Sequence, residues 1–499
     1  RSKMILILLA ASTFLAYLIV RYYRYIATFP KGPTPLPFIG NLHKLSLKKF
    51  YDYFEKISES NEFGSIYTVC LPFPTVVLST YEDIKEAFVT KGDIFIGRPH
   101  SIVSDMFTFT PNGGVINANG PEWREQRRTA ISILRDFGMG KNLMEQQVQA
   151  SIEEYLRCLD EIKDKRKVDM RWPIQKMISN VINQTLFGYR YKYDDCDELI
   201  EYVEGVNKLF EDIAKSPLLF AALMFPWIRH IPIINYYAVT IHKNNNDKLF
   251  DFIRRHVDRA LADFDPKEDE PTCFVHAYAQ RMLTNDMLTY DQLCGTAHDF
   301  FLAGQETTTT TLRWATLYMA QHQDVQDRLR AEIYDVVGTD RLACMADKPR
   351  MPYTVAVVNE LQRAANIIAV NVLHRVEEDT DIRGIKIPKG AFVNGDLHYI
   401  HTHDPVFKDA SEFRPERYLN QDGSLNKAVL ERTIPFSLGK RQCAGEGLAR
   451  MELFLCLVAT IQHYRILPLE DGTPISFEHQ PKSILMPVSN VLRIEKITE

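Results

Sequence analysis

One decapeptide near the C-terminus, Phe436 to Gly445 (FSLGKRQCAG), constrains this chain more than any other stretch. It places one cysteine, Cys443, between two glycines and shortly after the cations Lys440 and Arg441. We predict a helix that starts just after Cys443, because apolar residues recur there at helical spacing, at Leu448, Met451, Leu455 and Val458. The N–H groups and dipole at that helix start, with the two cations, favour the thiolate form of Cys443. A thiolate held in this way is a good iron ligand.

The alternative interpretation is a buried free cysteine beside a glycine turn. The residues at fixed offsets from Cys443 count against it. Gly439 and Gly445 let the backbone approach a flat cofactor closely. Phe436 can lie against such a cofactor, and Arg441 can pair with a carboxylate on its edge.

These residues match the Phe-x-x-Gly-x-Arg-x-Cys-x-Gly signature of the cytochrome P-450 (haem-thiolate) family. The amino-acid sequence of this stretch resembles that of microsomal animal members of family 2. The resemblance implies a mainly α fold with small β-sheets (α+β), in one catalytic domain behind an N-terminal membrane anchor. It also implies haem b as the cofactor, with Cys443 as the axial ligand of the iron and Phe436 and Arg441 among the cofactor-binding residues.

A second motif lies in a long predicted helix, Asp291 to Gln321, which contains no proline. Gly304 and the threonines that follow are poor helix formers, and such violations of local preference mark functional sites. Ala303 and Gly304 leave room for a small ligand, and Glu306 and Thr307 add a carboxylate and a hydroxyl that can relay protons. A threonine-rich helix face is the alternative. The stretch matches the family's oxygen-activation motif, which implies that Glu306 and Thr307 are catalytic and that Ala303 and Gly304 lie at the cofactor.

Four further residues resemble the family's ligands of the haem propionates. Trp123 and Arg127 are four residues apart and share a helical face, which by itself is typical of a surface cation–π contact. Arg98 and His374 match by position only. The chain departs from family 2 before His374, where the usual prolines are missing, and this weakens analogies about substrate.

A basic face formed by Arg124, Arg128 and Arg135 has two interpretations. It is either simply solvated or docks an acidic electron-donor protein, and Lys440 could extend it.

Glu360 and Arg363 are three residues apart on a predicted helix, a spacing that alone carries little information. The resemblance adds Arg417, in Phe413–Arg417, and implies a charge network that braces the loop carrying Cys443. We expect this network to be structural and not catalytic.

The N-terminus carries 17 uncharged residues, Met4 to Val20, followed by aromatic and basic residues. Its length of about 25 Å is at the low end of a membrane span, and a cleaved signal peptide is the alternative. We therefore predict three parts: an anchor (1–27), a proline-rich hinge (28–41) and the haem-thiolate monooxygenase domain (42–499). We expect strands within 63–79, near 382–387, at 392–395 and at 491–497, and mostly helices elsewhere.

The net charge, the cysteines and the apolar segments of the chain limit the classes of function that it can have. The net charge of −5 gives no case for nucleic-acid binding, and eight scattered cysteines fit reduced thiols in a cytosol-facing protein. The apolar run 216–227 is too short to span a membrane and could be a core helix, a pocket lid or a surface dipping into lipid. The segments expected around the pocket are mostly apolar, which favours a lipophilic substrate: Ile102–Val115, Phe210–Phe225, His298–Ala303, Ile367–Val372 and Ile484–Pro487.

We therefore expect a membrane-anchored monooxygenase that hydroxylates or epoxidises a steroid, a fatty acid or a xenobiotic with O2. The resemblance implies electrons from the NADPH–cytochrome P-450 reductase, leaves cytochrome b5 open as a second donor, and places the protein in the endoplasmic reticulum membrane with its catalytic domain facing the cytosol. Two alternatives remain: a reductase-independent enzyme that isomerises or rearranges peroxides at a haem thiolate, and a non-catalytic haem-binding sensor.

Overall fold

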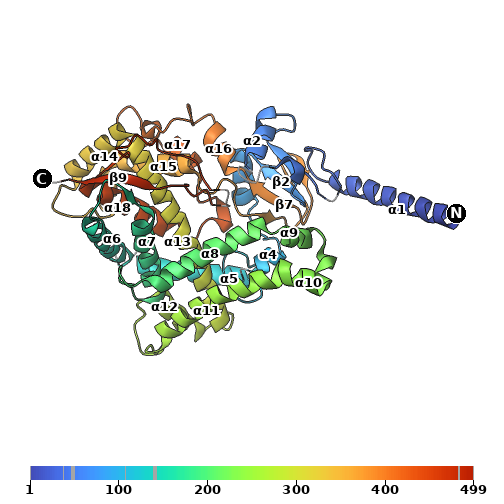
Figure 1. Cartoon of the computed structure of the whole chain (residues 1–499), viewed down its shortest axis with the longest axis horizontal. Coiled ribbons are helices and arrows are strands. Elements are labelled where there is room, and N and C mark those ends of the chain that lie inside the picture. The colour runs from blue at the N-terminus through green and yellow to red at the C-terminus, as the bar shows by residue number, and fades with distance from the viewer. Residues whose placement is uncertain are drawn as a thin grey trace. The chain divides into compact units, whose positions relative to one another are not determined.

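A 32-residue helix, α13 (Tyr290–Gln321), is the element against which much of the chain packs (Figure 1). The computed structural model describes residues 2–37, 39–45, 51–106, 108–138, 143–480 and 484–497. These residues form two compact units, each built from separate stretches of the chain. Unit 1 comprises residues 1–99, 370–400 and 437–442, and unit 2 comprises residues 100–369, 401–436 and 443–499. The predicted mixture of many helices with small sheets is confirmed.

Unit 1 contains a four-stranded sheet with the order β1-β2-β7-β4 and a separate hairpin, β5-β6. Strands β1 and β2 are antiparallel with Ile66 opposite Leu78, and β2 is parallel to β7. The predicted strands in 63–79 and at 392–395 are therefore confirmed, and the one near 382–387 is a hairpin. The elements are α1 (Ser2–Ile26), α2 (Tyr51–Ser60), β1 (Ile66–Cys70), β2 (Pro74–Leu78), α3 (Tyr81–Lys85), β4 (His374–Arg375), β5 (Thr380–Ile382), β6 (Ile385–Ile387), β7 (Phe392–Gly395) and the 3-10 turn η7 (Gly439–Arg441). The division between the units falls within α16 (Leu397–His403).

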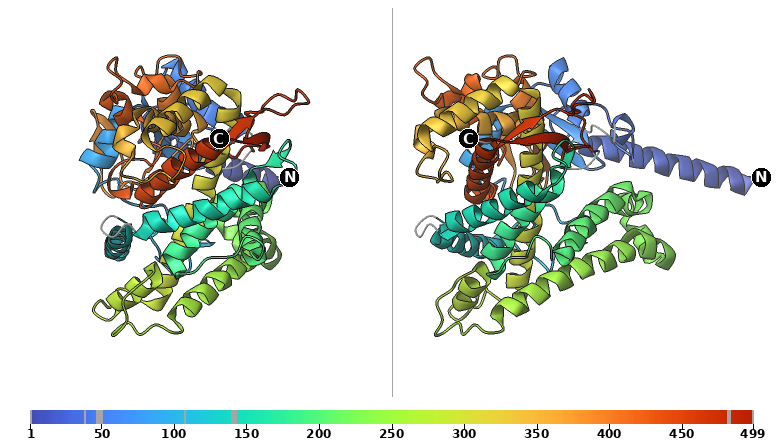
Figure 2. Two further views of the ribbon diagram at one scale, coloured as in Figure 1. Left: turned by 90° about the vertical axis from the view of Figure 1, so that its left-hand side faces the viewer. Right: turned by 60° about the vertical axis from the view of Figure 1, so that its left-hand side comes forward.

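Unit 2 is mainly helical and has one small sheet, β3-β9-β8. In both views of Figure 2 the long helices α8 and α11 run alongside each other. The elements are α4 (Ile102–Met106), α5 (Gly120–Gly138), α6 (Leu143–Glu161), β3 (Val168–Asp169), α7 (Arg171–Phe187), α8 (Asp197–Lys215), α9 (Pro217–Met224), α10 (Pro232–Asn235), α11 (Ile241–Leu261), α12 (Phe274–Met282), α13, α14 (Gln323–Val336), α15 (Pro352–Ala365), α17 (Lys427–Arg432), α18 (Glu446–His463), β8 (Tyr464–Leu467) and β9 (Val491–Lys496).

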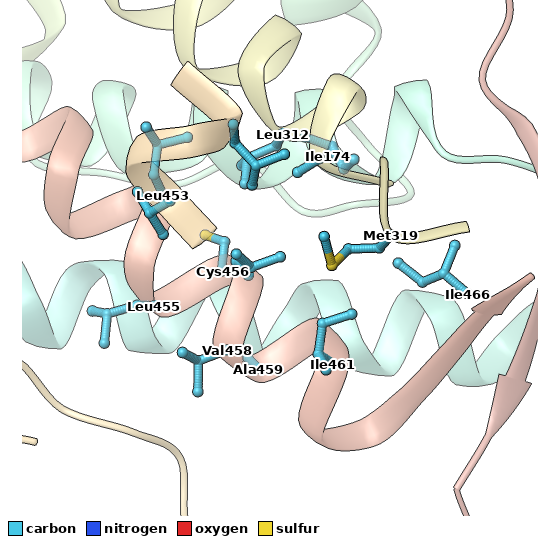
Figure 3. Close-up of a cluster of buried hydrophobic side chains, with 14 of the residues drawn as sticks. Ile174, Leu312, Met319, Leu453, Leu455, Cys456, Val458, Ala459, Ile461 and Ile466 are labelled. Carbon is cyan, nitrogen blue, oxygen red and sulfur yellow. The ribbon is translucent and has the colours of Figure 1, made fainter. Parts of the chain in front are cut away.

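The main core of unit 2 lies where α18 packs on α7 and α13 (Figure 3). Cys456 on α18 is fully buried there, and its sulfur lies 3.5 Å from the sulfur of Met177 on α7. Leu312 and Met319 come from α13, and Ile466 follows α18 on β8. Burial of these side chains fixes the position of α18, the helix that begins next to Cys443.

The N-terminal helix α1 extends to Ile26, and its side chains are largely exposed. Among the described residues it is the one helix long and apolar enough to cross a membrane. The described residues of the proline-rich segment after it, 28–37 and 39–41, contain no α-helix, as predicted. The segment is nevertheless tied to the edge strand β1: the N–H of Thr68 donates to Lys31, and Asn41 exchanges hydrogen bonds with Cys70. This part of unit 1 is therefore more than a spacer, because it covers a sheet edge.

Candidate functional site

Cys443 lies immediately before α18, so the predicted helix start is confirmed. The N–H of Cys443 donates to the carbonyl oxygen of Phe436 at 3.1 Å, which closes the chain into a loop. Arg450, one turn into α18, places its guanidinium 4.9 Å from the centre of the Phe436 ring and pairs with Glu446 at 2.7 Å. The helix that follows Cys443 thus also fixes the residue that opens the motif.

The electrostatic environment of Cys443 differs from the prediction. Cys443 is exposed to solvent, yet desolvation by the surrounding protein raises the pKa of its thiol. The N–H groups of Gly445 and Glu446 oppose this increase, as expected at a helix start. Within unit 1, Lys440 pairs with Asp93 and Arg441 donates to the carbonyl of Ile96, and the help of these two cations to the thiolate stays a prediction. A metal ion deprotonates a coordinating thiol outright, so iron ligation does not need a lowered pKa.

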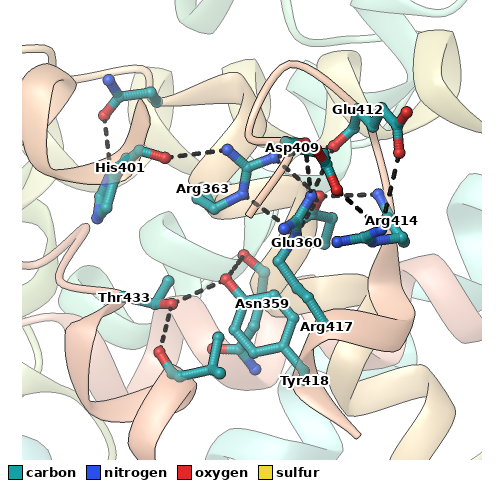
Figure 4. A network of polar contacts seen from close by, with 12 residues as sticks. Asn359, Glu360, Arg363, His401, Asp409, Glu412, Arg414, Arg417, Tyr418 and Thr433 are labelled. Carbon is teal, nitrogen blue, oxygen red and sulfur yellow. Dashed lines mark hydrogen bonds and ion pairs between the residues drawn. The ribbon is translucent and has the colours of Figure 1, made fainter. Parts of the chain in front are cut away.

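The predicted charge network is confirmed (Figure 4). Arg363 donates two hydrogen bonds of 2.8 Å to the two oxygens of Glu360, and Arg417 donates to Glu360 at 3.1 Å. All three side chains are buried. One buried carboxylate is therefore shared by two guanidinium groups, an arrangement in which the loss of either partner leaves an uncompensated charge.

The network continues toward Phe436 through His401. Arg363 donates to the His401 carbonyl at 3.0 Å, and the N–H of Ile434 donates to His401 Nε2 at 3.1 Å. Because Nε2 accepts, the ring proton lies on Nδ1, which is 3.1 Å from Asn366 Oδ1. Contacts thus connect α15 with the segment that leads into Phe436.

On α13, Ala303 and Thr307 lie one turn apart. Ala303 is exposed and Thr307 is half-buried, whereas most of the helix is buried. The hydroxyl of Thr307 donates to the Ala303 carbonyl at 2.8 Å, which fixes its oxygen on this face. The lack of a side chain at Gly304 is explained by packing: a Cβ at this position would lie 2.7 Å from the side chain of Ile182 on α7. The expected ligand space at Gly304 is therefore a close helix contact, and Ala303 supplies the open position.

Glu306 points to another side of α13, because successive helical residues are about 100° apart. Its side chain is 7% exposed, and its Oε1 accepts a hydrogen bond of 2.9 Å from Asn207 on α8. The preceding residue, Gln305, accepts from Ser179 on α7 at 3.3 Å. Glu306 and Thr307 are neighbours in sequence, but the structure places them on different faces.

Unit 1 gathers Arg98, His374 and Arg441, three of the predicted propionate ligands. The ring of His374 stacks on Phe88 at 4.0 Å, and its Nδ1 lies 2.6 Å from the carbonyl oxygen of Phe95. Burial holds the pKa of His374 well below its usual value, and the positive charges of Arg98 and Arg441 lower it further.

The two arginines of this cluster are buried and anchored by backbone. Arg98 donates to the carbonyls of Val372 and Leu373 at 3.0 and 2.8 Å. Gly439, next to Arg441, has a φ of +78°, and a Cβ there would lie 1.8 Å from the Phe88 carbonyl oxygen. The backbone at Gly439 therefore approaches Phe88 closely. A side chain at this position would displace the turn that carries Arg441.

Unit 2 contributes Trp123 and Arg127 from α5. The Arg127 guanidinium lies 5.9 Å from the Trp123 ring, and the Trp123 N–H donates to the Val115 carbonyl at 3.1 Å. Burial lowers the pKa of Arg127, and the charge of Cys443 opposes this change, so the two side chains lie within electrostatic range. Arg127 and Cys443 are therefore brought together within one unit.

The three cations of the predicted basic face, Arg124, Arg128 and Arg135, are exposed on α5. Arg128 pairs with Glu125 at 2.8 Å, which reduces the positive charge of this face.

Each unit separately offers groups that suit a haem. In unit 2, Cys443 is an exposed cysteine, and iron in haem-thiolate proteins takes a cysteine sulfur as its axial ligand. Arg98 and Arg441 are buried guanidinium groups, which suit carboxylates because they bind them in a planar, bidentate manner. Ala303 presents an exposed methyl group in place of a bulky side chain.

Sequence reasoning missed three polar residues of this region, of which Asp299 and Glu452 are buried and Asn207 is half-buried. Asn207 contacts Glu306, and Asp299 on α13 accepts the N–H groups of Val115 and Ile116 at 2.7 and 2.9 Å. Glu452 on α18 is fully buried and is hydrogen-bonded to a threonine of α13. Single polar residues in amphipathic helices carry no distinguishing pattern, although Glu452 interrupts an apolar run and could have been flagged for that reason.

Comparison with known proteins agrees with this geometry. The family model described as Cytochrome P450 matches residues 30–493. Cytochrome P450 2F3 of Capra hircus and cytochrome P450 2F1 of Homo sapiens are each 36% identical to this chain, over 91% of its length and 90% of theirs. Cytochrome P450 2H2 of Gallus gallus is 34% identical over 89% of both chains. With a family signature around Cys443 and relatives matching along nearly the whole length, the chain belongs to the cytochrome P450 family of haem-containing monooxygenases.

Proposed function

We propose that this monooxygenase inserts oxygen into lipophilic small molecules, by hydroxylation or epoxidation of a steroid, a fatty acid or a xenobiotic. We further propose that NADPH–cytochrome P450 reductase supplies the electrons and that cytochrome b5 can serve as a second donor. The observation that carries the proposal is Cys443, which combines the family signature, an accessible sulfur and a position at the start of α18. The apolar composition of the expected pocket segments supports a lipophilic substrate.

We propose Cys443 as the axial ligand, with Phe436, Ala303 and Gly304 near the cofactor. Bound haem supplies the activation of O2, and its thiolate ligand favours cleavage of the O–O bond. The propionates would pair with cationic and polar side chains that match the family by position: Arg98, Trp123, Arg127, His374 and Arg441.

The residues of the chain itself would supply protons and a restricted space. Thr307 keeps its oxygen beside Ala303 because its proton is used in the bond to the Ala303 carbonyl, so its lone pairs can accept a proton donor. Glu306 is the proposed carboxyl that replenishes protons. Since the two side chains lie on different faces of α13, we infer that a water molecule passes the proton between them.

We propose that the protein is attached to the endoplasmic reticulum membrane with its body in the cytosol, and two features support attachment to a membrane. Helix α1 is long and apolar enough to cross a bilayer. Unit 2 also exposes large apolar side chains between α9 and α11, including Trp227 at 65% and Ile233 at 73% exposure. These exposed residues favour the lipid-contact interpretation of the 216–227 region over a core helix. The predicted parts 1–27, 28–41 and 42–499 remain our proposal for the domain boundaries.

The exposed arginines of α5 support a docking surface for an acidic electron donor, since complementary charge accelerates association. Arg124 and Arg135 are exposed on this face of α5.

The alternative of a reductase-independent, peroxide-rearranging enzyme is less well supported. Glu306 and Thr307 form a means of delivering protons to O2, which such an enzyme does not need. A non-catalytic haem-binding sensor would not need it either.

Carbon monoxide difference spectroscopy of the reduced protein tests the proposal. We expect the thiolate-type Soret band from the wild type and its loss in Cys443→Ala. Cys456→Ala is the matched control, because this cysteine lies on α18 but is buried in the core. Survival of the band in Cys443→Ala would overturn the ligand assignment. NADPH- and reductase-dependent oxidation of lauric acid, testosterone and 7-ethoxycoumarin then separates the substrate classes, and turnover of a hydroperoxide without NADPH would favour the rearranging enzyme.

A further inference from the structure

We propose that Asn207, on α8, is a positioning residue that holds the Glu306 carboxyl in place for proton delivery; the inference rests on the proposed role of Glu306. Asn207 belongs to no motif and would not be chosen from the sequence. Its amide nitrogen lies 2.9 Å from Glu306 Oε1 and 3.1 Å from the carbonyl oxygen of Val203, one turn back on α8. The two N–H bonds of the amide are thereby directed to different acceptors, which fixes its orientation.

The burial of the two partners makes this contact significant. Glu306 is buried, whereas Asn207 is only half-buried. A hydrogen bond to a carboxylate is among the stronger ones, and it gains strength where water is excluded. Glu306 thus has a fixed donor on the side of α8, away from the exposed face with Ala303 and Thr307.

A second contact shows that this part of α13 is held from two directions. Gln305 accepts a hydrogen bond from Ser179 on α7, and Ser179 in turn accepts from Gln175 at 3.2 Å. Contacts from α7 and α8 at successive residues determine the rotation of α13 about its axis, and hence where Thr307 lies. The contact from α8 differs in kind because it acts directly on the proposed proton donor.

The expected consequence is a change in the fate of O2. If the Glu306 carboxyl turns away, fewer protons reach the distal oxygen through it. A larger share of the electrons from NADPH then reduces O2 to hydrogen peroxide. The balance is O2 + NADPH + H⁺ → H2O2 + NADP⁺, with the electrons passing through the reductase. A substrate that displaces α8 would change the same partition, so the contact links the position of this helix to the efficiency of oxygen insertion.

The test compares Asn207→Leu with Asn183→Leu in the full-length, haem-loaded protein with its reductase. Asn183 is a buried asparagine on α7 that donates to the carbonyl of Tyr189, so its loss reports the cost of removing a buried amide. The hydrogen peroxide released per NADPH oxidised is measured in the presence of lauric acid. We expect at least a twofold increase in Asn207→Leu relative to Asn183→Leu. Equal ratios in the two variants would overturn the positioning role.

A thermal-unfolding cycle provides a readout that does not depend on turnover. The melting temperature is measured for Asn207→Leu, Glu306→Leu and the double variant, because leucine at either position removes one partner of the hydrogen bond. Adding the decreases of the two single variants gives an additive melting temperature for the double variant. We expect the measured value to lie several degrees above it, because the two residues interact. Additive decreases would overturn the contact itself. If the wild type lacked the thiolate spectrum or turnover, the proposed function would fail while this cycle still reported on Asn207 and Glu306.

Discussion

Replacing Glu452 with glutamine should stabilise the folded protein at neutral pH and remove a pH dependence. Glu452 is fully buried on α18, and burial raises the pKa of its carboxyl from 4.5 to about 8, while the hydroxyl of Thr308 on α13 limits the increase. The folded chain therefore keeps this proton up to about pH 8, whereas the unfolded chain loses it near pH 4.5. Stability contributed by the neutral carboxyl is complete below pH 4.5 and is lost as the pH rises to 8.

The size of the effect follows from the two pKa values. Each pH unit between them costs about 1.4 kcal/mol of unfolding free energy, since the unfolded state alone releases the proton. At pH 7 the cost is (7 − 4.5) × 1.36, or about 3.4 kcal/mol, and above pH 8 it approaches (8 − 4.5) × 1.36, or about 5 kcal/mol. Glutamine has nearly the shape of the neutral acid and does not titrate.

The assay is urea unfolding of the haem-loaded protein in detergent at pH 5.5, 6.5 and 7.5, followed by tryptophan fluorescence. The stability of Glu452→Gln relative to the wild type should increase by about 1.4 kcal/mol per pH unit. Glu478→Gln, at an exposed glutamate, should show no such trend. A constant difference between Glu452→Gln and the wild type at the three pH values would refute the reasoning.

Three other perturbations follow from the structure. Glu360→Gln leaves two buried guanidinium groups without their carboxylate, and we expect a loss of about 3–5 kcal/mol, seen as a large decrease in haem-loaded protein. Asp299→Asn should abolish a pH dependence in which the wild type loses about 2.7 kcal/mol between pH 5 and 7, because burial raises the pKa of Asp299 from 3.8 to about 7; urea unfolding at the two pH values checks this. Removal of residues 1–27 should leave part of the protein bound to phospholipid vesicles, and Trp227→Ser with Ile233→Ser should release that part in a flotation assay; unchanged flotation would argue against the lipid contact.

The sequence predicted those parts of the site that depend on local spacing. The helix start after Cys443 follows from apolar periodicity, whereas the separation of three residues showed only that Glu360 and Arg363 could be neighbours on a helix. The addition of Arg417 required the family resemblance, because no local rule links residues 57 positions apart. Cys443 was recognisable as the candidate haem ligand because the offsets around it are fixed by one short segment.

The remaining features depend on partners that are distant in sequence. Gly304 looked like a space for a ligand, but Ile182 fills the position of its absent side chain. Gly439 looked like a cofactor contact, but it meets the Phe88 carbonyl. Desolvation of Cys443 outweighed the local charges from which a thiolate was predicted. Such effects arise only when separate elements are packed together, so no window of sequence contains them.

The weak helical segment of α13 shows how packing determines which residues face the site. Glycine and a run of threonines disfavour a helix here, and the threonine hydroxyls compete for backbone carbonyls. Neighbouring helices compensate, because successive positions contact different partners, while Ala303 stays exposed and Thr307 half-buried. These contacts are Gly304 with Ile182 of α7, Gln305 with Ser179 of α7, Glu306 with Asn207 of α8, and Thr308 with Glu452 of α18. The segment is thus helical because α7, α8 and α18 contact it on several faces. The hydroxyl of Thr307 lies on a face apart from these contacts. A change in any of these contacts would therefore act on the site through the rotation of α13, even where the altered residue touches neither haem nor substrate.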